Sequence, residues 1–273
     1  MISNFGGIFA EICKNHDKIK PCKIIKKGNK EKMEISDVFR FKQFEIYQNK
    51  CTMKVNTDGV LLGAWSEIDD RKQALDIGSG TGIIAMMLSQ RSPSLMITGI
   101  EIDEDAYLQA RSNMQHSKFS ERLFAVHSAL QDYASITETR FDLIISNPPF
   151  FTGGTFSSNE NKANVRHTIK LSHADLLLSV KKLLSPEGYF DLILPYIEGL
   201  RFIEMAGKYD LSLKKMTEVR SRENKNIERL LLRFRHGHGS AFDQDELIIY
   251  NGVGVKDYSY EFQALTKEFY LFM

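Results

Sequence analysis

Short apolar segments alternate with helix-like segments from residue 73 onward, and this alternation limits the possible folds more than any other feature. The strand-like runs are QALDIG, LMITGIEI, LFAVHS, FDLIIS and YFDLILP, and the helical patterns are GIIAMMLSQR, EDAYLQARSNMQHS and HADLLLSVKKLL. Strands that alternate with helices form a parallel sheet covered by helices on both faces. The later β-like stretches LSLKKMTEVRS, ERLLLRFRH and DELIIY are expected to close the sheet as antiparallel partners. The sequence therefore predicts an α/β fold.

The chain of 273 residues divides into a lysine-rich start and one large domain. Residues 1–36 contain few apolar clusters and show no clear period, so we expect a weakly ordered extension that precedes or includes an alternative start at Met33. Residues 37–273 contain no repeat and no linker, which predicts a single domain. Alternating apolar residues at its beginning predict a small β-hairpin or one bent strand.

Composition excludes few functions by itself. The chain is 42% hydrophobic and 26% charged, which is ordinary for a globular protein, and its formal net charge is +1. Overall charge therefore does not indicate nucleic-acid binding. Lysines gather between Lys14 and Lys32, however, and a second basic region runs from Arg220 to Arg235. Each region alone is typical of a solvated tail or a charged sheet face.

Cysteine, histidine and hydropathy patterns indicate the environment of the protein. The three cysteines form no CxxC pair and the histidines show no metal-ligand spacing, so we expect a reduced cytoplasmic protein without a metal. No apolar run reaches the roughly 18 residues that span a bilayer, and the N-terminus lacks a signal pattern. The sequence predicts no membrane association.

A glycine-rich segment, LDIGSGTG, joins the first strand of the regular pattern to the first helix. Gly78, Gly80 and Gly82 allow a tight turn and leave room for a ligand at the helix N-terminus. A purely structural turn is an equal alternative for the glycines alone. The spacing is GxGxG, whereas dinucleotide-binding folds use GxGxxG, which argues against an NAD enzyme.

Polar residues flank this loop where ligands bind in open α/β sheets, outside the carboxyl ends of the strands. Asp76 precedes the glycines, Glu101 ends the second strand, and Ser128 follows the third. A carboxylate such as Glu101 can accept hydrogen bonds from both hydroxyls of a ribose. This set resembles the class I S-adenosylmethionine-dependent methyltransferases. The resemblance implies a Rossmann-like, seven-stranded, mostly parallel sheet and S-adenosyl-L-methionine as cofactor.

The segment SNPPFF follows the fourth strand, FDLIIS. Two consecutive prolines fix two φ angles, remove two N–H donors and favour an extended residue before them. A rigid corner after Asn147 is the result, at the same sheet edge as the glycine loop. As an isolated motif it is typical of a simple turn; after a fourth parallel strand, it indicates a site.

The NPPF pattern at this position resembles the catalytic motif of methyltransferases that act on exocyclic or amide nitrogens. The resemblance implies that the Asn147 side-chain oxygen and the Pro148 carbonyl accept the two N–H groups of a planar amine. Such acceptors favour the pyramidal nitrogen that becomes positive during methyl transfer. Phe150, together with Phe151, would stack on the extruded base, and no general base is needed.

A more specific resemblance concerns the residues before the glycine loop. FKQF and KVNTDGVLLGAW resemble stretches of the bacterial tRNA-valine adenine-N6 methyltransferases, which modify the adenosine 3′ of the anticodon (position 37). The similarity covers residues 37–235 and implies a tRNA substrate. It places Lys54, Thr57 and Asp58 over the cofactor pocket, with Asp58 capping a helix that starts at Gly59. The extension before Met33 departs from the family pattern.

Several alternatives remain at this point. An rRNA guanine-N2 methyltransferase also carries NPPF, and a protein glutamine methyltransferase usually carries NPPY. A non-catalytic RNA-binding protein on a decayed methyltransferase fold is a different class, which the intact motifs disfavour. For RNA contacts we expect the tail, Arg166 and the 220–235 region, with further candidates at Lys42, Lys54 and His167. We expect a monomer.

Overall fold

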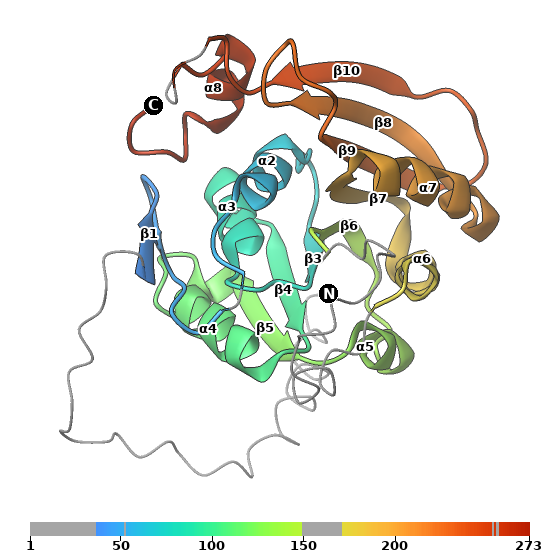
Figure 1. Ribbon diagram of the computed structural model, residues 1–273. Coiled ribbons are helices and arrows are strands. Elements are labelled where there is room, and N and C mark those ends of the chain that lie inside the picture. The colour runs from blue at the N-terminus through green and yellow to red at the C-terminus, as the bar shows by residue number, and fades with distance from the viewer. Residues whose placement is uncertain (1–36, 52, 149–170, 253, 255–256) are drawn as a thin grey trace, which may run out of the picture. The chain divides into compact units, whose positions relative to one another are not determined.

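The structure is a computed structural model that describes residues 37–51, 53–148, 171–252, 254 and 257–273 (Figure 1). Contacts within the chain separate the segment Met1–Glu34 from a compact unit, Ile35–Met273. The fold described below is that of the second unit.

A central sheet of eight strands confirms the α/β class (Figure 1). Its order is β10-β8-β9-β7-β6-β3-β4-β5, and β9 alone runs opposite to its neighbours. The strands are β3 (Gln73–Ile77), β4 (Met96–Glu101), β5 (Leu123–His127), β6 (Phe141–Ser146), β7 (Leu184–Pro195), β8 (Leu211–Arg220), β9 (Arg229–His236) and β10 (Asp243–Ile248).

The eighth strand corrects the expectation that every late strand pairs antiparallel. β9 enters the sheet between β7 and β8, and it is antiparallel to both. The next strand, β10, runs opposite to β9 and meets the free side of β8. It therefore pairs parallel to β8, with Asp243 opposite Lys215.

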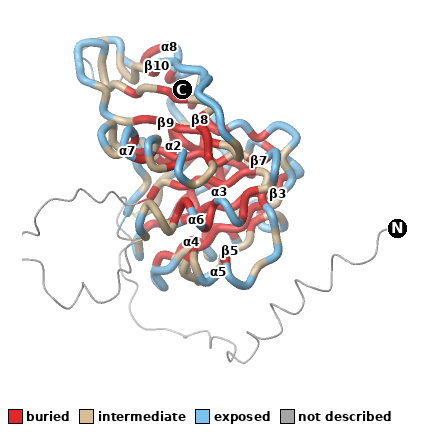
Figure 2. The backbone as a smooth tube through the Cα atoms, turned by 90° about the vertical axis from the view of Figure 1, so that its right-hand side faces the viewer, coloured by how far each residue is buried: buried red, intermediate tan, exposed pale blue. Residues whose placement is uncertain are grey.

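Helices cover both faces of the sheet, because each strand alternates apolar side chains between two cores. In β9, Leu231 packs into one core, whereas Leu230 and Leu232 pack into the other. Figure 2 shows the buried residues concentrated along the strands. The first core lies under α2 (Thr57–Trp65), α3 (Ile83–Arg91), α4 (Glu104–Gln115) and α8 (Tyr260–Thr266), and the second under α5 (Leu130–Ile136), α6 (His173–Leu183) and α7 (Tyr196–Ala206).

The N-terminal hairpin is also confirmed. β1 (Val38–Arg40) pairs antiparallel with β2 (Glu45–Tyr47). Lys42 in its turn donates its amine to the carbonyls of Lys267 and Met273, at 2.6 and 2.7 Å. In the fold, this candidate for RNA contact binds the C-terminal segment of the chain, and its contact with RNA stays a prediction.

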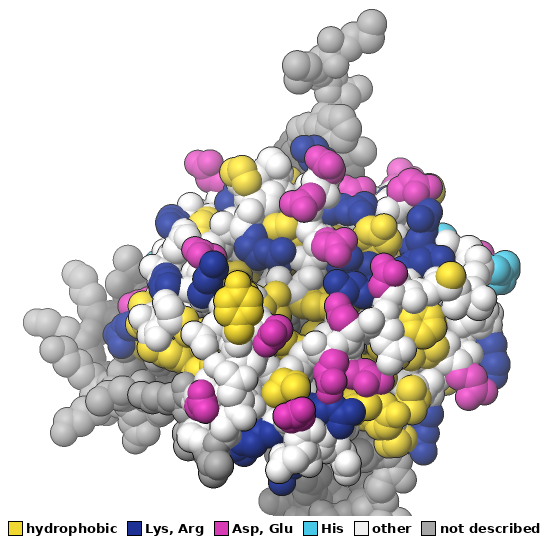
Figure 3. All heavy atoms as spheres, turned by 90° about the horizontal axis from the view of Figure 1, so that it is seen from above, with side chains coloured by type: hydrophobic (Ala, Val, Ile, Leu, Met, Phe, Trp, Pro, Cys, Tyr) yellow, Lys and Arg dark blue, Asp and Glu magenta, His cyan; other side chains and the backbone are white. Residues whose placement is uncertain are grey.

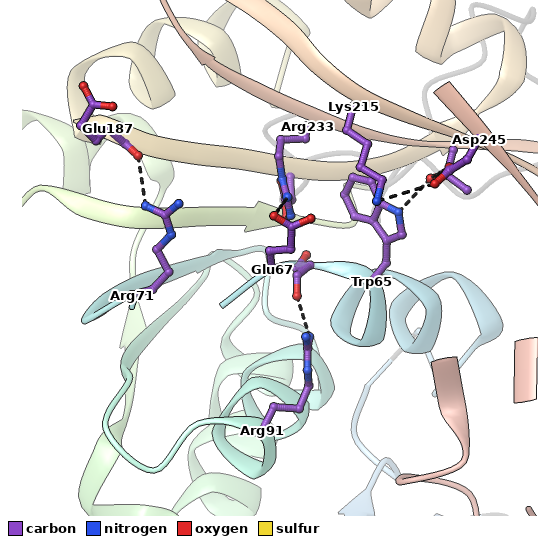
Figure 4. A network of polar contacts seen from close by, with 11 residues as sticks. Trp65, Glu67, Arg71, Arg91, Glu187, Lys215, Arg233 and Asp245 are labelled. Atoms are coloured by element: carbon purple, nitrogen blue, oxygen red, sulfur yellow. Dashed lines mark hydrogen bonds and ion pairs between the residues drawn. The ribbon is translucent and has the colours of Figure 1, made fainter. Parts of the chain in front are cut away.

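A buried arginine connects the sheet to the end of α2. Arg233 of β9, only 3% exposed, donates two hydrogen bonds of 2.8 Å to Asp191 of β7. Its third contact is an ion pair of 2.6 Å with Glu67, just beyond α2 (Figure 4). The guanidinium also lies over the rings of Trp65 and Tyr189, at 5.0 and 4.9 Å. One cation thus joins two strands and the end of a helix.

Further contacts attach the same end of α2. The Trp65 indole N–H donates to the hydroxyl of Thr217 at 2.8 Å, and the Lys215 amine lies 5.5 Å from the indole ring (Figure 4). From α3, Arg91 donates to the carbonyls of Gly63 and Ser66. The helix is therefore fixed at its C-terminal end, which sets the direction of its N-terminal turn.

Replacing Arg233 with methionine should destabilise the fold strongly. The substitution leaves the fully buried Asp191 carboxylate without its cation, which costs about 3–5 kcal/mol. The matched control is Arg235→Met, which removes the more exposed pair with Glu187 and should cost about 0–1 kcal/mol. Urea denaturation of both variants measures the difference. Equal losses in the two variants would contradict a structural role for the buried pair.

Candidate active site

The carboxyl ends of the parallel strands form one edge, and the candidate residues gather there. Ile77 at the end of β3 is level with Ile100 of β4 and Ser146 of β6, and Glu101 pairs with His127 of β5. Side chains or loops that follow these positions therefore share the edge. They are Gly78, Gly80, Gly82, Ser128 and Asn147; Glu101 ends its strand at this edge, and Asp76 lies one residue before Ile77.

The glycines of this loop are required for two different reasons. Gly78 and Gly80 adopt φ angles of 69° and 55°, in the left-handed region, and an added Cβ on Gly78 would meet nothing within 4 Å. At Gly82 (φ 82°) a Cβ would lie 3.2 Å from Met114 Cε. Gly82 therefore allows α3 to pack against α4, whereas Gly78 and Gly80 leave open space for a ligand.

Glu101 is fixed by the backbone around it. One carboxylate oxygen accepts the N–H groups of Ile102 and Asp103, at 2.9 and 3.0 Å. The other accepts the N–H of Gly80 at 2.9 Å. A carboxylate can accept about four hydrogen bonds, so acceptor capacity remains for a ligand. The side chain is thus held in place, half-buried, beside the glycine loop.

Asp76 is a buried carboxylate without a well-formed partner. It is 0% exposed, and neither oxygen makes a hydrogen bond of good geometry within the described structure. Burial raises its pKa to about 7; the backbone N–H of Ala85 lowers the pKa only in part, and the charge of Glu101 raises it further. An unpaired buried acid next to an open loop is suited to a cationic ligand.

Ser128 lies beside Glu101 at the end of β5. Its N–H donates to the Glu101 carbonyl at 3.0 Å, which continues the pairing of β4 and β5 beyond the strands. Its hydroxyl donates to the neighbouring carbonyl of Ala129 at 2.9 Å. The residue therefore reaches the expected edge, but its hydroxyl hydrogen is engaged locally.

The first turn of α2 reaches the same edge, and here one sequence expectation is wrong. The cap of α2 is Asn56, whose side chain accepts the N–H of Gly59 at 2.9 Å. Asp58 lies inside the first turn and pairs with Arg229 of β9 at 2.9 Å. Asn56 is the earlier side chain with the correct cap geometry, so Asp58 is free for the ion pair. Lys54, just before the helix, is exposed.

The proline corner begins at this edge. The buried Ser146 hydroxyl donates to the Ile77 carbonyl at 3.0 Å, which ties the end of β6 to β3. Asn147 follows, half-buried, and its amide nitrogen would lie 3.8 Å from a Cβ added to Gly59. Among the described residues, the Asn147 side chain makes no hydrogen bond. Pro148 is buried.

The aromatic half of the motif and one basic residue lie outside the described part. Phe150, Phe151 and Arg166 fall within 149–170, as does His167. Their expected roles on the substrate side stay predictions.

The basic region between residues 220 and 235 separates into two groups. Arg220 and Arg229 lie at the carboxyl edge, where β8 ends and β9 begins. Arg233 is buried, and Arg235, near the opposite end of β9, pairs with Glu187. Of this candidate RNA-binding region, Arg233 is therefore engaged inside the fold, and the RNA contacts of the other residues stay predictions.

Asn113 of α4 is a positioning residue that the sequence analysis missed. Its side chain, 3% exposed, donates to the carbonyls of Tyr47 and Thr81 at 2.8 and 2.9 Å and accepts the Tyr47 N–H. It therefore joins the glycine loop to β2. A polar residue between the apolar Ala110 and Met114 of one helix was the available signal.

The described residues also show which groups are absent. They contain no group of three or more His, Cys, Asp or Glu side chains that could hold a metal ion. Their helices are all too short or too polar to cross a membrane.

Comparison with protein families places the site in a known context. The family model "Methyltransferase small domain" matches residues 57–181, from the first turn of α2 to α6. This range includes the glycine loop, Glu101 and the proline corner.

Curated relatives match over nearly their whole length. A tRNA1(Val) (adenine(37)-N6)-methyltransferase from Proteus mirabilis is 42% identical over 238 residues, 86% of this chain and 94% of the relative. A protein of the same name from Dyadobacter fermentans is 40% identical, over 85% of this chain and 97% of the relative.

Solved structures agree in fold. Protein Atu636 from Agrobacterium tumefaciens, a predicted O-methyltransferase, gives a TM-score of 0.62 at 18% identity, over 78% of this chain and 96% of that one. The glycopeptide N-methyltransferase MtfA, solved with S-adenosyl-L-methionine, gives 0.50 at 12% identity, over 67% and 100%. On its identity and coverage with the curated relatives, the chain belongs to the family of tRNA1(Val) (adenine(37)-N6)-methyltransferases, with a class I methyltransferase fold.

Proposed function

We propose that this enzyme transfers a methyl group from S-adenosyl-L-methionine to N6 of adenine 37 in valine tRNA. The names of the curated relatives support this substrate. The observation that carries the proposal is the half-buried Asn147 amide, which makes no hydrogen bond among the described residues and lies at the edge that holds the glycine loop and Glu101. The guanine and glutamine alternatives receive no support from these relatives.

The residues present fit the cofactor. Bound S-adenosyl-L-methionine supplies an electrophilic methyl group; it also carries a ribose diol and positive charge. Glu101, fixed by three backbone N–H groups, has acceptor capacity left for the diol. The open faces of Gly78 and Gly80 allow close approach of a ligand. We assign Ser128 and Lys54 to the rim of this pocket on their positions alone.

The Asp76 carboxylate would interact electrostatically with the positive charge of the cofactor. A buried carboxylate without a good partner is costly, and a cation nearby offsets that cost. Asp58 contributes indirectly, because its ion pair with Arg229 holds the first turn of α2 against the sheet. Gly82 has a packing role and only shapes the loop.

On the substrate side, the acceptors at the proline corner act on the amine. The Asn147 side-chain oxygen and the Pro148 carbonyl would each accept one N–H of the adenine amino group. This arrangement favours a pyramidal nitrogen whose lone pair can form the new bond to carbon. The methylated nitrogen is positive at first and becomes neutral by releasing one proton to water. We propose that Phe150 and Phe151 stack on the flipped base and that Arg166 contacts RNA.

Location, assembly and domain limits complete the proposal. We propose a cytoplasmic monomer whose methyltransferase domain spans residues 37–273, with residues 1–36 as an additional lysine-rich extension. The match to the relatives covers 94% and 97% of their lengths but only 86% and 85% of this chain, which supports an added segment. Its lysines could bind RNA phosphates.

Glu101→Gln tests the ribose contact. The amide loses the charge that strengthens hydrogen bonds from the diol, so cofactor affinity should fall by about 1.5–3 kcal/mol. The matched control is Glu104→Gln, an exposed carboxylate at the start of α4, which should leave affinity unchanged. Isothermal titration calorimetry with S-adenosyl-L-methionine measures both. Unchanged affinity in Glu101→Gln would remove this residue from the cofactor site.

The pKa of Asp76 predicts a pH dependence of cofactor binding. Because burial raises this pKa to about 7, the carboxyl is protonated in the free protein below that pH. A cationic ligand favours the charged form, so affinity should rise by up to about tenfold per pH unit from pH 5.5 to 7. The isosteric Asp76→Asn variant should bind weakly and without this slope. A flat profile in the parent protein would contradict a charge contact.

Asn147→Ala tests the chemical step. Loss of one preorganised acceptor should lower kcat by about 10²–10³-fold, on the order of 2.7–4 kcal/mol, with little change in cofactor affinity. Gln115→Ala, an exposed amide at the far end of α4, is the control and should turn over normally. Single-turnover methylation of a valine tRNA transcript, followed by nucleoside mass spectrometry, gives the rate and the product. If Asn147→Ala turned over as fast as the parent enzyme, the proline corner would have only a structural role.

A further inference from the structure

A pocket opens at the same sheet edge, near the proline corner. It lies between the end of β7, the first turn of α7 and the loop 221–228 that joins β8 to β9, and its volume is about 660 Å³. This size is typical of small-ligand sites. Its walls include Tyr196, Glu198, Arg220, Asn226, Ile227 and Glu228.

The pairing of β6 with β7 fixes how far this pocket lies from the corner. Ser146 pairs with Leu192, so Asn147 is level with the residue after Leu192. Pro195, at the pocket, lies two residues further along the neighbouring strand. With strands about 4.8 Å apart and a rise of about 3.3 Å per residue, the backbone separation is about 8 Å. One nucleotide of an opened strand spans such a distance.

An ion pair and a close approach of α2 link the region of the pocket to the proline corner. Arg229 pairs in register with Pro195 and forms an ion pair of 2.9 Å with Asp58. Asp58 precedes Gly59, whose added Cβ would lie 3.8 Å from the Asn147 amide nitrogen. The strand beside Pro195 is therefore joined by an ion pair to the first turn of α2, which lies near Asn147.

The charges at the pocket favour a neutral ligand over a phosphate. Glu198 forms an ion pair with Arg201 at 2.9 Å, and Glu228 accepts the hydroxyl of Ser221. Arg220 is engaged with Glu246 and with the carbonyl of Lys225. No cation lining the pocket is therefore left over for a free anion. A pocket with two lining carboxylates would also repel one.

The other side chains that line the pocket can contact both the face and the edge of a nucleobase. Tyr196 and Ile227 offer flat and apolar surface against which a base can pack. Asn226 is exposed, and its amide makes no hydrogen bond among the described residues. An amide can both donate to and accept from a base edge, and carboxylates accept from exocyclic amino groups. The acceptors of Glu198 and Glu228 favour bases with an amino group over uracil.

We propose that this pocket binds the nucleobase adjacent to the target adenosine and thereby contributes to substrate selection. The base enters when the target adenine is turned toward Asn147. Asn226 reads its edge and Tyr196 packs against its face. This inference rests on the proposed function, because it requires an RNA whose adenine is presented at the corner.

The test uses the full-length protein and full-length valine tRNA transcripts. Three RNAs are compared: the parent sequence, one without the base 5′ of the target, and one without the base 3′ of it. The enzymes are the parent, Asn226→Ala, Tyr196→Leu and the control Asn224→Ala, an exposed asparagine in the same loop that does not line the pocket. Thermal unfolding verifies that each variant is folded.

The expected result is a loss of about tenfold in kcat/KM when one of the two flanking bases is removed, the scale of one lost base contact. On the parent RNA, kcat/KM of Asn226→Ala and of Tyr196→Leu should fall by a similar factor. On the RNA that lacks that base, the variants should be no slower than the parent enzyme, because the protein change and the RNA change remove the same contact. Asn224→Ala should behave like the parent enzyme. The flanking base, 5′ or 3′ of the target, whose removal lowers kcat/KM is the one that enters the pocket.

Other outcomes separate the two proposals. If the parent enzyme methylates the tRNA but neither missing base matters, or if the variant and RNA effects multiply, the pocket does not bind a flanking base. If the parent enzyme binds S-adenosyl-L-methionine but forms no N6-methyladenosine in any RNA, the proposed function itself fails. A uridine at the identified position should lower kcat/KM more than a cytidine. The reverse order would contradict the inference that carboxylates in the pocket walls accept hydrogen bonds from a base amino group.

Discussion

The hydrogen-bonded pair of Arg233 and Asp191 is the contact on which the arrangement of the site depends. Both side chains are almost fully buried, where an unpaired charge would be very costly, so each fixes the position of the other. The same guanidinium also reaches Glu67 and lies over Trp65, at the end of α2. Strand β7, strand β9 and α2 are thereby held at one point in the centre of the fold.

This point of attachment determines what happens at the other end of α2. A helix fixed at its C-terminal end presents its first turn in a defined direction, and here that turn faces the carboxyl edge of the sheet. Arg229, four residues before Arg233 on β9, pairs with Asp58 in that turn. Gly59 in the same turn lies near Asn147, since a Cβ added to it would be 3.8 Å from the Asn147 amide nitrogen. The edge at which we propose methyl transfer is therefore built from both the sheet and a helix that precedes it in the sequence.

Local patterns predicted much of this fold, and long-range pairs explain what they missed. Strand and helix periods, glycine spacing and the proline corner depend on neighbouring residues, and they placed the strands and the candidate edge. Asp58 was misread as a cap because Asn56, two residues earlier, is an equally good cap, and only the ion pair with Arg229 distinguishes them. Arg233 was read as a surface charge because its partner, Asp191, is forty-two residues away. No sequence period reports such a pair.

The distribution of charge follows from the same contacts and bears on how RNA is recognised. On the face seen from above, basic and acidic side chains are intermixed and neither sign dominates (Figure 3). Arg233 and Arg235 of β9 neutralise carboxylates of the protein itself, and Arg229 does so at the catalytic edge. The arginines of β9 are thus engaged within the protein, so cations for RNA phosphates must come from other elements, such as the exposed Lys54. Because the arginine closest to the proposed site, Arg229, pairs with Asp58, base edges and stacking are expected to contribute to recognition there, which is the chemistry that we propose for Asn147 and the adjoining pocket.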